Sequence, residues 1–402
     1  MGLKFKIFFF TFLHVFALSA TSCLFAESPK GEANFSSSRS TTEVARVQFV
    51  ESKIASLRRT EEIFVSGGIF HFTDGAVLDD EGNLWEKFKR LPEKETRPFA
   101  SVSSDGSCNE IHLIQLGNSD LVAGQTFDPE GGDPCHLFIG NKKTSSYFKV
   151  DRGEYAFDSE FKYMFISGWE KIFFWDLEGQ KRLWVMSYEE LNISPLCRVV
   201  RAVILPKDDA IILTLDCNPN SDESGTDVRV IDLKGEIKLR AYGIEIATAT
   251  GDGTMLFART GGSAWTVLLQ KISLKDFSYI WQKEFEVTTS DLELLKFGGG
   301  TKILDLGSQH DHVYIVVGQS NYVSKTKHAS ISKKQIAPKL DETFRDCIFV
   351  FTPKGDPIYK TKIFGISIPH MISLNTSLVL ISKNNKAIRA RSGSHWDTYE
   401  LR

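Results

Sequence analysis

Beyond residue 26 the sequence contains no uncharged apolar run long enough to cross a membrane. It also contains no nucleophile elbow, HExxH helix, P-loop or dinucleotide fingerprint. Its 48 basic and 51 acidic residues nearly cancel, so no bulk electrostatic attraction to nucleic acid is expected. Long segments with a 3.6-residue apolar period are almost absent, which argues against long helices. These absences exclude the common enzyme motifs without indicating an activity.

One long apolar run stands at the start of the chain. Lys4 and Lys6 precede an apolar stretch from Ile7 to Ala20, and small residues follow it. This order is typical of a secretory signal peptide, which we predict to span residues 1–26. Export to the periplasm or the extracellular space would follow.

Three alternatives for this leader stay open. Signal peptidase would cleave after Ala26 or Ala20. The run Ala20-Thr21-Ser22-Cys23 resembles a bacterial lipobox without the usual Leu, so lipid attachment at Cys23 would instead make a lipoprotein. An uncleaved anchor is the third alternative, because about twenty apolar residues suffice for a span.

Residues 27–45 are rich in Ser and charged residues, and we expect a disordered tether there. Residues 46–402 are expected to form one folded domain. Overall, 42% of the residues are hydrophobic and 12% are aromatic, which suffices for a large core.

A short strand-turn pattern returns four times along this domain. Each copy has a turn ending in Gly, followed three to five residues later by a large apolar residue. The copies are Leu78–Gly82 with Trp85, Trp175–Gly179 with Trp184, Ile231–Gly235 with Leu239, and Phe351–Gly355 with Tyr359. Self-similarity at this spacing predicts a stacked or radial repeat, in which the large apolar residue packs one unit on the next.

A second pattern consists of two apolar strands about a polar turn and predicts β-hairpins. The hairpins are Tyr155–Ile166, Val203–Leu215, Ile246–Phe257, Ile303–Val317 and Ile372–Ile381, with Ala100–Ile114 as a weaker sixth. Hairpin and turn together give a four-stranded unit repeated about seven times. The fold class is therefore all-β, as a single β-propeller of about seven four-stranded blades. A two-sheet β-sandwich is the alternative.

The turn motifs also carry a family resemblance. Trp175-Asp176 is placed as in a WD repeat, and the order Asp176, Gly179, Trp184 is similar to the quinoprotein repeat with its Gly one residue early. On these residues the chain resembles the broad group of WD-repeat, NHL-type and quinoprotein-like propellers. The resemblance implies a closed ring, in which Val47–Val50 would complete the last blade by pairing with strands near the C-terminus.

Three polar insertions interrupt the repeat at the same place, before the strand that leads to the turn. They are Gly124–Pro134, Cys217–Asp227 and Gln319–Asp346. Because that connection always falls on one rim of a propeller, we expect the insertions to crowd one face and to bind a partner. The last insertion is basic, and its candidate partner-binding residues are Lys325, Lys327, His328, Lys333 and Lys334. A merely solvated loop is the simpler interpretation of such a charge run.

Metal and cofactor signals are sparse. In the middle insertion Asp216, Asn218, Asn220 and Asp222 alternate as calcium ligands would, but Ser221 replaces the expected Gly. We expect a solvated turn here rather than a calcium site. His310 and His312 favour a polar hairpin turn over a metal site, and no cofactor is expected.

Five cysteines follow the leader, in a compartment that permits disulfides. Cys197 and Cys217 flank one hairpin unit, and Cys108 and Cys135 flank another, so these are the expected pairs. Five buried thiols are the alternative, with Cys347 left over in either case.

Two functional classes survive. The first is an exported, non-catalytic propeller that binds a protein or cell-envelope component through its insertion-rich face, touching a membrane only through a lipid at Cys23 or an uncleaved leader. The second is a hydrolase or lyase that acts on a sugar or lactone in the axial pocket. We expect the first, because the inner-strand ends show no convergent set of acids and histidines.

Overall fold

The computed structural model describes residues 32–33, 57–64, 77–85, 88–91, 94, 97, 99, 110–117, 119–127, 134–151, 153–217, 225–261, 265–288, 292, 300–319, 346–363, 366, 374, 377–392 and 395–401. The predicted signal peptide, Cys23 and Val47–Val50 lie outside these residues. So does the predicted tether apart from Glu32 and Ala33.

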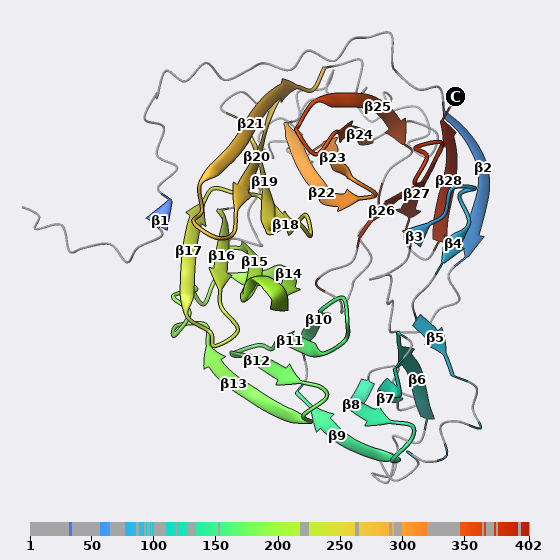
Figure 1. The fold of residues 1–402 in the computed structure, drawn as a ribbon, viewed down its shortest axis with the longest axis vertical. Helices are drawn as coiled ribbons and strands as arrows, with labels where there is room; N and C mark the ends of the chain where they lie inside the picture. Colours follow the sequence, from blue (N-terminus) through green and yellow to red (C-terminus); the bar gives the residue numbers. More distant parts are fainter. Residues whose placement is uncertain are drawn as a thin grey trace, which may run out of the picture.

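The described chain is all-β, and its sheets stand side by side around a ring in Figure 1. In three sheets the strands follow the chain order. The first sheet contains β10 (Glu154–Phe157), β11 (Tyr163–Ser167), β12 (Lys171–Asp176) and β13 (Lys181–Ser187), and the second contains β18 (Ile246–Ala249), β19 (Thr254–Thr260), β20 (Thr266–Ser273) and β21 (Tyr279–Glu286). The third contains β22 (Thr301–Gln309), β23 (His312–Gln319), β24 (Asp346–Phe351) and β25 (Pro357–Ile363). Each has four antiparallel strands, as a propeller blade has.

Two further sheets have five strands. One runs from β5 (Phe88–Arg90) through β6 (Glu110–Leu116), β7 (Leu121–Phe127) and β8 (Pro134–Asn141) to β9 (Ser146–Val150). The other contains β14 (Arg198–Leu205), β15 (Ala210–Asp216), β16 (Thr226–Ile231) and β17 (Ile237–Tyr242), with β1 (Glu32–Ala33) added parallel to β17. The short 3-10 helix η4 (Pro206–Asp208) joins β14 to β15.

The last four-stranded sheet combines the two ends of the described chain. The strands β26 (Val379–Ile381), β27 (Ala387–Ser392) and β28 (His395–Leu401) are completed by β2 (Leu57–Phe64), which pairs antiparallel with β28. An N-terminal strand therefore does complete the C-terminal sheet, although the pairing strand is Leu57–Phe64. A two-stranded sheet of β3 (Val77–Leu78) and β4 (Leu84–Trp85) touches β26 through the bridge between Leu78 and Ser382.

The repeated turns adopt one geometry. In three copies the Gly amide donates to a carbonyl three residues earlier, and the Gly is left-handed, with φ of 84° at Gly82, 90° at Gly235 and 81° at Gly355. A side chain with a Cβ is strained at such an angle, which explains the Gly. In the fourth copy the left-handed residue is Gln180, one position after Gly179. The early Gly of that repeat therefore reflects a turn that is one residue longer.

Four of the predicted hairpins are confirmed, as β10–β11, β14–β15, β18–β19 and β22–β23. Residues 100–109 of the weaker sixth lie outside the described part. The hairpin expected at Ile372–Ile381 is wrong. Strand β26 pairs with β27 instead, and the backbone of Leu374 bonds to Tyr155 and Ala202 of other sheets.

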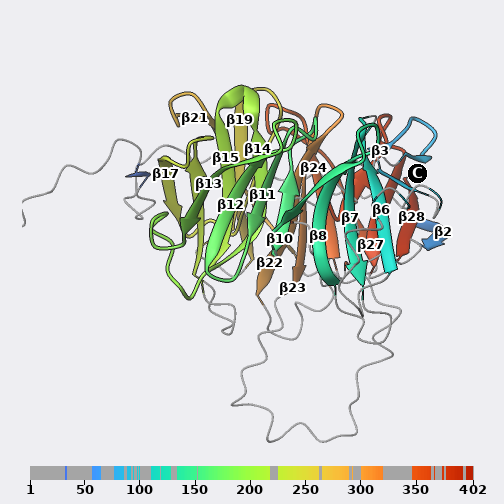
Figure 2. The ribbon, with the colours of Figure 1, turned by 90° about the horizontal axis from the view of Figure 1, so that it is seen from below.

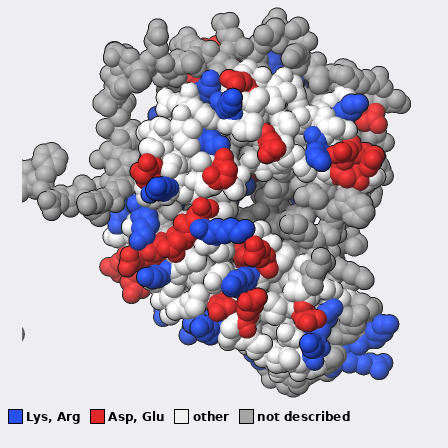
Figure 3. Space-filling model, in the orientation of Figure 1, with Lys and Arg blue, Asp and Glu red and all other residues white. Residues whose placement is uncertain are grey.

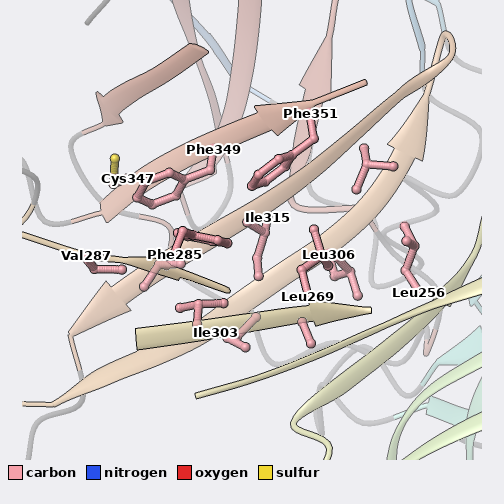
Figure 4. Packing of buried hydrophobic residues seen from close by; sticks show 14 of the residues in the cluster. Leu256, Leu269, Phe285, Val287, Ile303, Leu306, Ile315, Cys347, Phe349 and Phe351 are labelled. Carbon is pink, nitrogen blue, oxygen red and sulfur yellow. The ribbon is translucent and has the colours of Figure 1, made fainter. Parts of the chain in front are cut away.

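The core lies between neighbouring sheets. Strand β15 is apolar along nearly its whole length and buried, whereas every residue of the outer strand β13 is exposed or half-buried. Figure 4 shows one such layer, in which Leu256, Leu269 and Phe285 of one sheet face Ile315, Phe349 and Phe351 of the next. Each sheet thus buries its faces against its neighbours, as expected of units too small to fold alone.

The inner strands are tied together across the ring. A guanidinium nitrogen of Arg201 in β14 lies 2.8 Å from a carboxylate oxygen of Asp305 in β22, and both side chains are buried. The backbone N–H groups of Leu306 and Leu378 and the hydroxyl of Tyr314 also donate to Asp305. This carboxylate therefore has partners on three elements, as a buried charge requires.

Candidate functional site

The three predicted insertions occupy the same topological position. They join β7 to β8, β15 to β16 and β23 to β24, and each leads into the outermost hairpin of its sheet. The loop residues 128–133, 218–224 and 320–345 lie outside the described part, and with them Asn218, Asn220, Asp222, Lys325, Lys327, His328, Lys333 and Lys334. The ends of the bordering strands are described, and they show where the chain enters and leaves each loop.

These strand ends define a face of the molecule. The sheets stand side by side with their strands running between two edges (Figure 2). The repeated Gly turns close the outermost hairpins at one edge, which we call the turn face. The insertions enter the same hairpins from the opposite edge, which we call the insertion face and define by the ends Phe127, Pro134, Asp216, Thr226, Gln319 and Asp346.

The sheet β10–β13 has a tight turn at the corresponding position. The turn joins β11 to β12, and the amide of Gly168 donates to the carbonyl of Lys171 across it at 2.9 Å. Trp169 stands at its tip with 98% of its surface exposed. Tryptophan is enriched at protein interfaces, where a partner covers the ring. This residue carries no sequence signal, because its exposure depends on the hairpin that presents it.

A second exposed apolar side chain lies on the next connection of the same face. Leu196, 75% exposed, precedes Cys197 at the start of β14. The predicted disulfide between Cys197 and Cys217 is confirmed and ties this connection to the base of the middle insertion. The hydroxyl of Tyr188, at the start of the connection, donates to the carbonyl of Gly168 at 2.9 Å. The connection and the Trp169 hairpin are therefore in direct contact.

The polar groups beneath these tips form short-range pairs. Arg198 and Asp216 approach to 3.5 Å at the insertion-face ends of β14 and β15. Burial raises the pKa of Glu154, at the start of the inner strand β10, although Arg198 opposes the rise. Burial likewise raises the pKa of Asp227, against the attraction of Arg229 at 3.3 Å. Asp216, the described member of the calcium candidates, thus has an arginine partner.

Other predicted candidates fall elsewhere. Within the described residues, no group of three His, Cys, Asp or Glu side chains is arranged to hold a metal ion. His310 lies in the left-handed β22–β23 turn, and His312 contacts the carbonyl of His310 and the amide of Asn385. These two histidines form a polar turn, as the sequence favoured. Cys347 is buried in β24, and Cys108 lies outside the described residues.

The opposite face has mixed charge. In the view of Figure 3, acidic and basic side chains are interspersed over the described surface, and no single sign dominates. At the base of one Gly turn, Lys238 pairs with Asp232. Such a surface lacks the one-signed field that steers a charged macromolecule.

Comparison with known proteins adds little. No family model and no curated protein matches this sequence. Among solved structures, the chain is similar to hydrazine synthase of Kuenenia stuttgartiensis, with 8% sequence identity and a TM-score of 0.39 over 66% of this chain and 69% of that chain. A similarity this weak says nothing about activity. No helix among the described residues is long and apolar enough to span a membrane.

Proposed function

We propose that this chain is an exported, non-catalytic β-propeller of about seven blades that binds a protein or cell-envelope component through its insertion face. The signal peptide of residues 1–26 would deliver it to the periplasm or the extracellular space. Pairing of β2 with β28 would close the ring and leave no exposed sheet edge there. Attachment through Cys23 or an uncleaved leader would hold it at the membrane.

The observation that carries this proposal is the shared topology of the insertions. The strand ends that border three connections, and the Trp169 hairpin, all lead into the outermost hairpin of their sheets, so these ends lie at one edge of the sheets. Loops held on a rigid scaffold are where binding residues concentrate. Burial raises the pKa of Glu154 and of Asp158, but these two carboxylates lie at opposite ends of the inner strand β10, so they do not form the adjacent acid and base that the hydrolase alternative needs.

The test is affinity capture from a native envelope extract. A variant with Gln319–Asp346 replaced by a short Gly-Ser turn is compared with the unmodified protein. A turn-face variant, Lys234→Ser with Lys354→Ser, controls for the loss of exposed basic residues. We expect the unmodified protein and the turn-face variant to capture the same component and the loop variant to lose it. Equal capture by all three, or by none, would contradict the proposal.

A further inference from the structure

Two side chains on the insertion face are exposed far beyond the others. Eight large hydrophobic residues are exposed in the described chain, and six of them lie between 39% and 52%. Trp169 at 98% and Leu196 at 75% stand apart from that group. We call these two residues the apolar tips.

Both tips are held rigidly. Trp169 sits on a two-residue turn closed by the Gly168 to Lys171 hydrogen bond. Leu196 lies in a turn where its amide donates to the hydroxyl of Ser194, and the following Cys197 is fixed by its disulfide. A pre-organised apolar side chain loses little conformational entropy when a partner covers it. Exposed aromatic residues on such rigid turns are the anchors that dominate protein interfaces.

The charges around the tips distinguish between possible partners. Glu170 directly follows Trp169, and Glu189 lies on the connection that carries Leu196; both are exposed. Glu190 is exposed as well and interacts with Lys171, and hydrogen bonds from Ser187 lower its pKa. Arg198, close to Leu196 in the sequence, pairs with Asp216, so among the described residues Glu170 and Glu189 are the acids near the tips that form no ion pair. An acidic rim repels an anionic membrane surface and attracts a surface that carries Lys or Arg.

We propose that Trp169 and Leu196 anchor a docking site for a protein that offers an apolar pocket with a basic rim. This inference rests on the proposed binding function and names the chemistry of the partner. The indole fills the pocket, Leu196 extends the apolar contact, and Glu170 and Glu189 meet the basic rim.

The experiment uses the full chain, with a C-terminal affinity tag, in membranes of the cells that make it. The component captured by the unmodified protein is identified, purified and titrated against each variant. Trp169→Ala with Leu196→Ser should weaken binding by about 30-fold or more, as loss of an interface anchor does. Leu183→Ser with Val185→Ser, which alters exposed apolar residues of the outer strand β13, should leave the affinity unchanged.

Charge reversal and lipid vesicles test the chemistry of the partner. Glu170→Lys with Glu189→Lys should slow association, and the difference should shrink as salt is added. Vesicles of phosphatidylglycerol and phosphatidylethanolamine should not bind. Vesicle binding that is lost with Trp169→Ala would overturn the inference in favour of a lipid surface.

The outcomes separate the two claims. If a component is captured but the Trp169→Ala, Leu196→Ser variant binds it as well as the unmodified protein does, the tips are not the anchor and only this inference fails. If the unmodified protein captures nothing, the proposed binding function fails with it. Because both tips are exposed, the variant should unfold at the same denaturant concentration as the unmodified protein, so a lost interaction reports binding rather than misfolding.

Discussion

At the scale of single residues, two tryptophans on outer strands link neighbouring sheets by the same contact. The indole N–H of Trp184 donates to the carbonyl of Leu233 at 2.8 Å, and that of Trp281 donates to the carbonyl of Pro353 at 3.0 Å. Both acceptors lie in the Gly turn of the next sheet. A Cβ on Gly355 would come within 3.1 Å of the Trp281 ring, so the small Gly also makes room for the tryptophan.

Removing these indole donors should cost stability. We expect Trp184→Phe and Trp281→Phe each to lower the free energy of unfolding by about 1 kcal/mol, the usual net worth of one hydrogen bond. Urea unfolding followed by circular dichroism measures the change. Trp169→Phe is the matched control and should shift stability by less than about 0.5 kcal/mol, because that ring is exposed. A control that costs as much as the two inter-sheet variants would refute this role for the indoles.

The raised pKa of Glu154 makes a second prediction at this scale. Burial disfavours its charged form in the folded state, so the folded protein holds the proton to a higher pH than the unfolded chain, whose value is near 4.5. Its contribution to stability therefore falls as pH rises from about 4.5 through the folded pKa. Glu154→Gln should remove this fall. Denaturant unfolding at several pH values compares it with Glu170→Gln, which removes one charge from an exposed turn and should keep the fall.

Sequence reasoning reached one of the two tryptophans. Trp184 follows a recognisable Gly turn, whereas Trp281 follows Ser273–Ser278, a turn without Gly in which Phe277 is left-handed, with φ of 57°. The motif is recognised by its Gly, so it misses a turn that contains none and in which another residue is left-handed. Trp169 was missed for a different reason, since exposure is a property of the folded hairpin.

At the scale of elements, the disulfide between Cys197 and Cys217 closes the hairpin β14–β15. It was predicted because the two cysteines flank that hairpin, and antiparallel pairing of Arg198 with Asp216 brings them together. Cys197→Ser with Cys217→Ser should lower the free energy of unfolding by about 3 kcal/mol, by the loop-entropy relation for a loop of this length.

The measurement is denaturant unfolding with and without a reductant. The unmodified protein should lose about 3 kcal/mol more on reduction than the double-serine variant does. A variant that loses as much on reduction as the unmodified protein would mean that another disulfide carries the effect. Hydrogen exchange in residues 188–197 should also rise in the variant, because the connection carrying Leu196 loses its tether.

The hairpin predicted at Ile372–Ile381 failed because the backbone of Leu374 bonds to strands of other sheets. The sequence around Leu374 alternates like a hairpin, yet its amide donates to the carbonyl of Tyr155 and its carbonyl accepts from Ala202. Local pattern fixes extended conformation but leaves the pairing partner open, because backbone groups of any strand are equivalent. In each of the four confirmed hairpins a short turn joins the two strands. The turn brings the strands next to each other, so they pair with each other.

At the scale of the whole molecule, the ion pair between Arg201 and Asp305 joins two inner strands separated by an entire sheet. Asp305→Ala should cost about 3–5 kcal/mol, because it leaves the buried Arg201 charge uncompensated. Asp151→Ala, which breaks the exposed pair with Arg182, is the control and should cost at most about 1 kcal/mol. Thermal and denaturant unfolding measure both variants. Equal losses of stability in Asp305→Ala and Asp151→Ala would contradict a central role for the buried pair.

No sequence signal could have paired Arg201 with Asp305, which are 104 residues apart. The repeat predicts what the units have in common, whereas the ion pair depends on an Arg in one unit and an Asp in another. The location of the insertions was predictable for the opposite reason. It depends only on strand order within each unit, which the repeat itself reveals.

The central claim, that the insertion face is the working surface, is tested most directly by site-specific photo-crosslinking in native membranes. A photoreactive residue is placed at Trp169 or Gly225 on the insertion face, and at Lys234 or Lys354 on the turn face. The account predicts crosslinks to the same partner from both insertion-face positions and none from the turn face. Crosslinks of equal yield from the turn face, or none from any position, would contradict it.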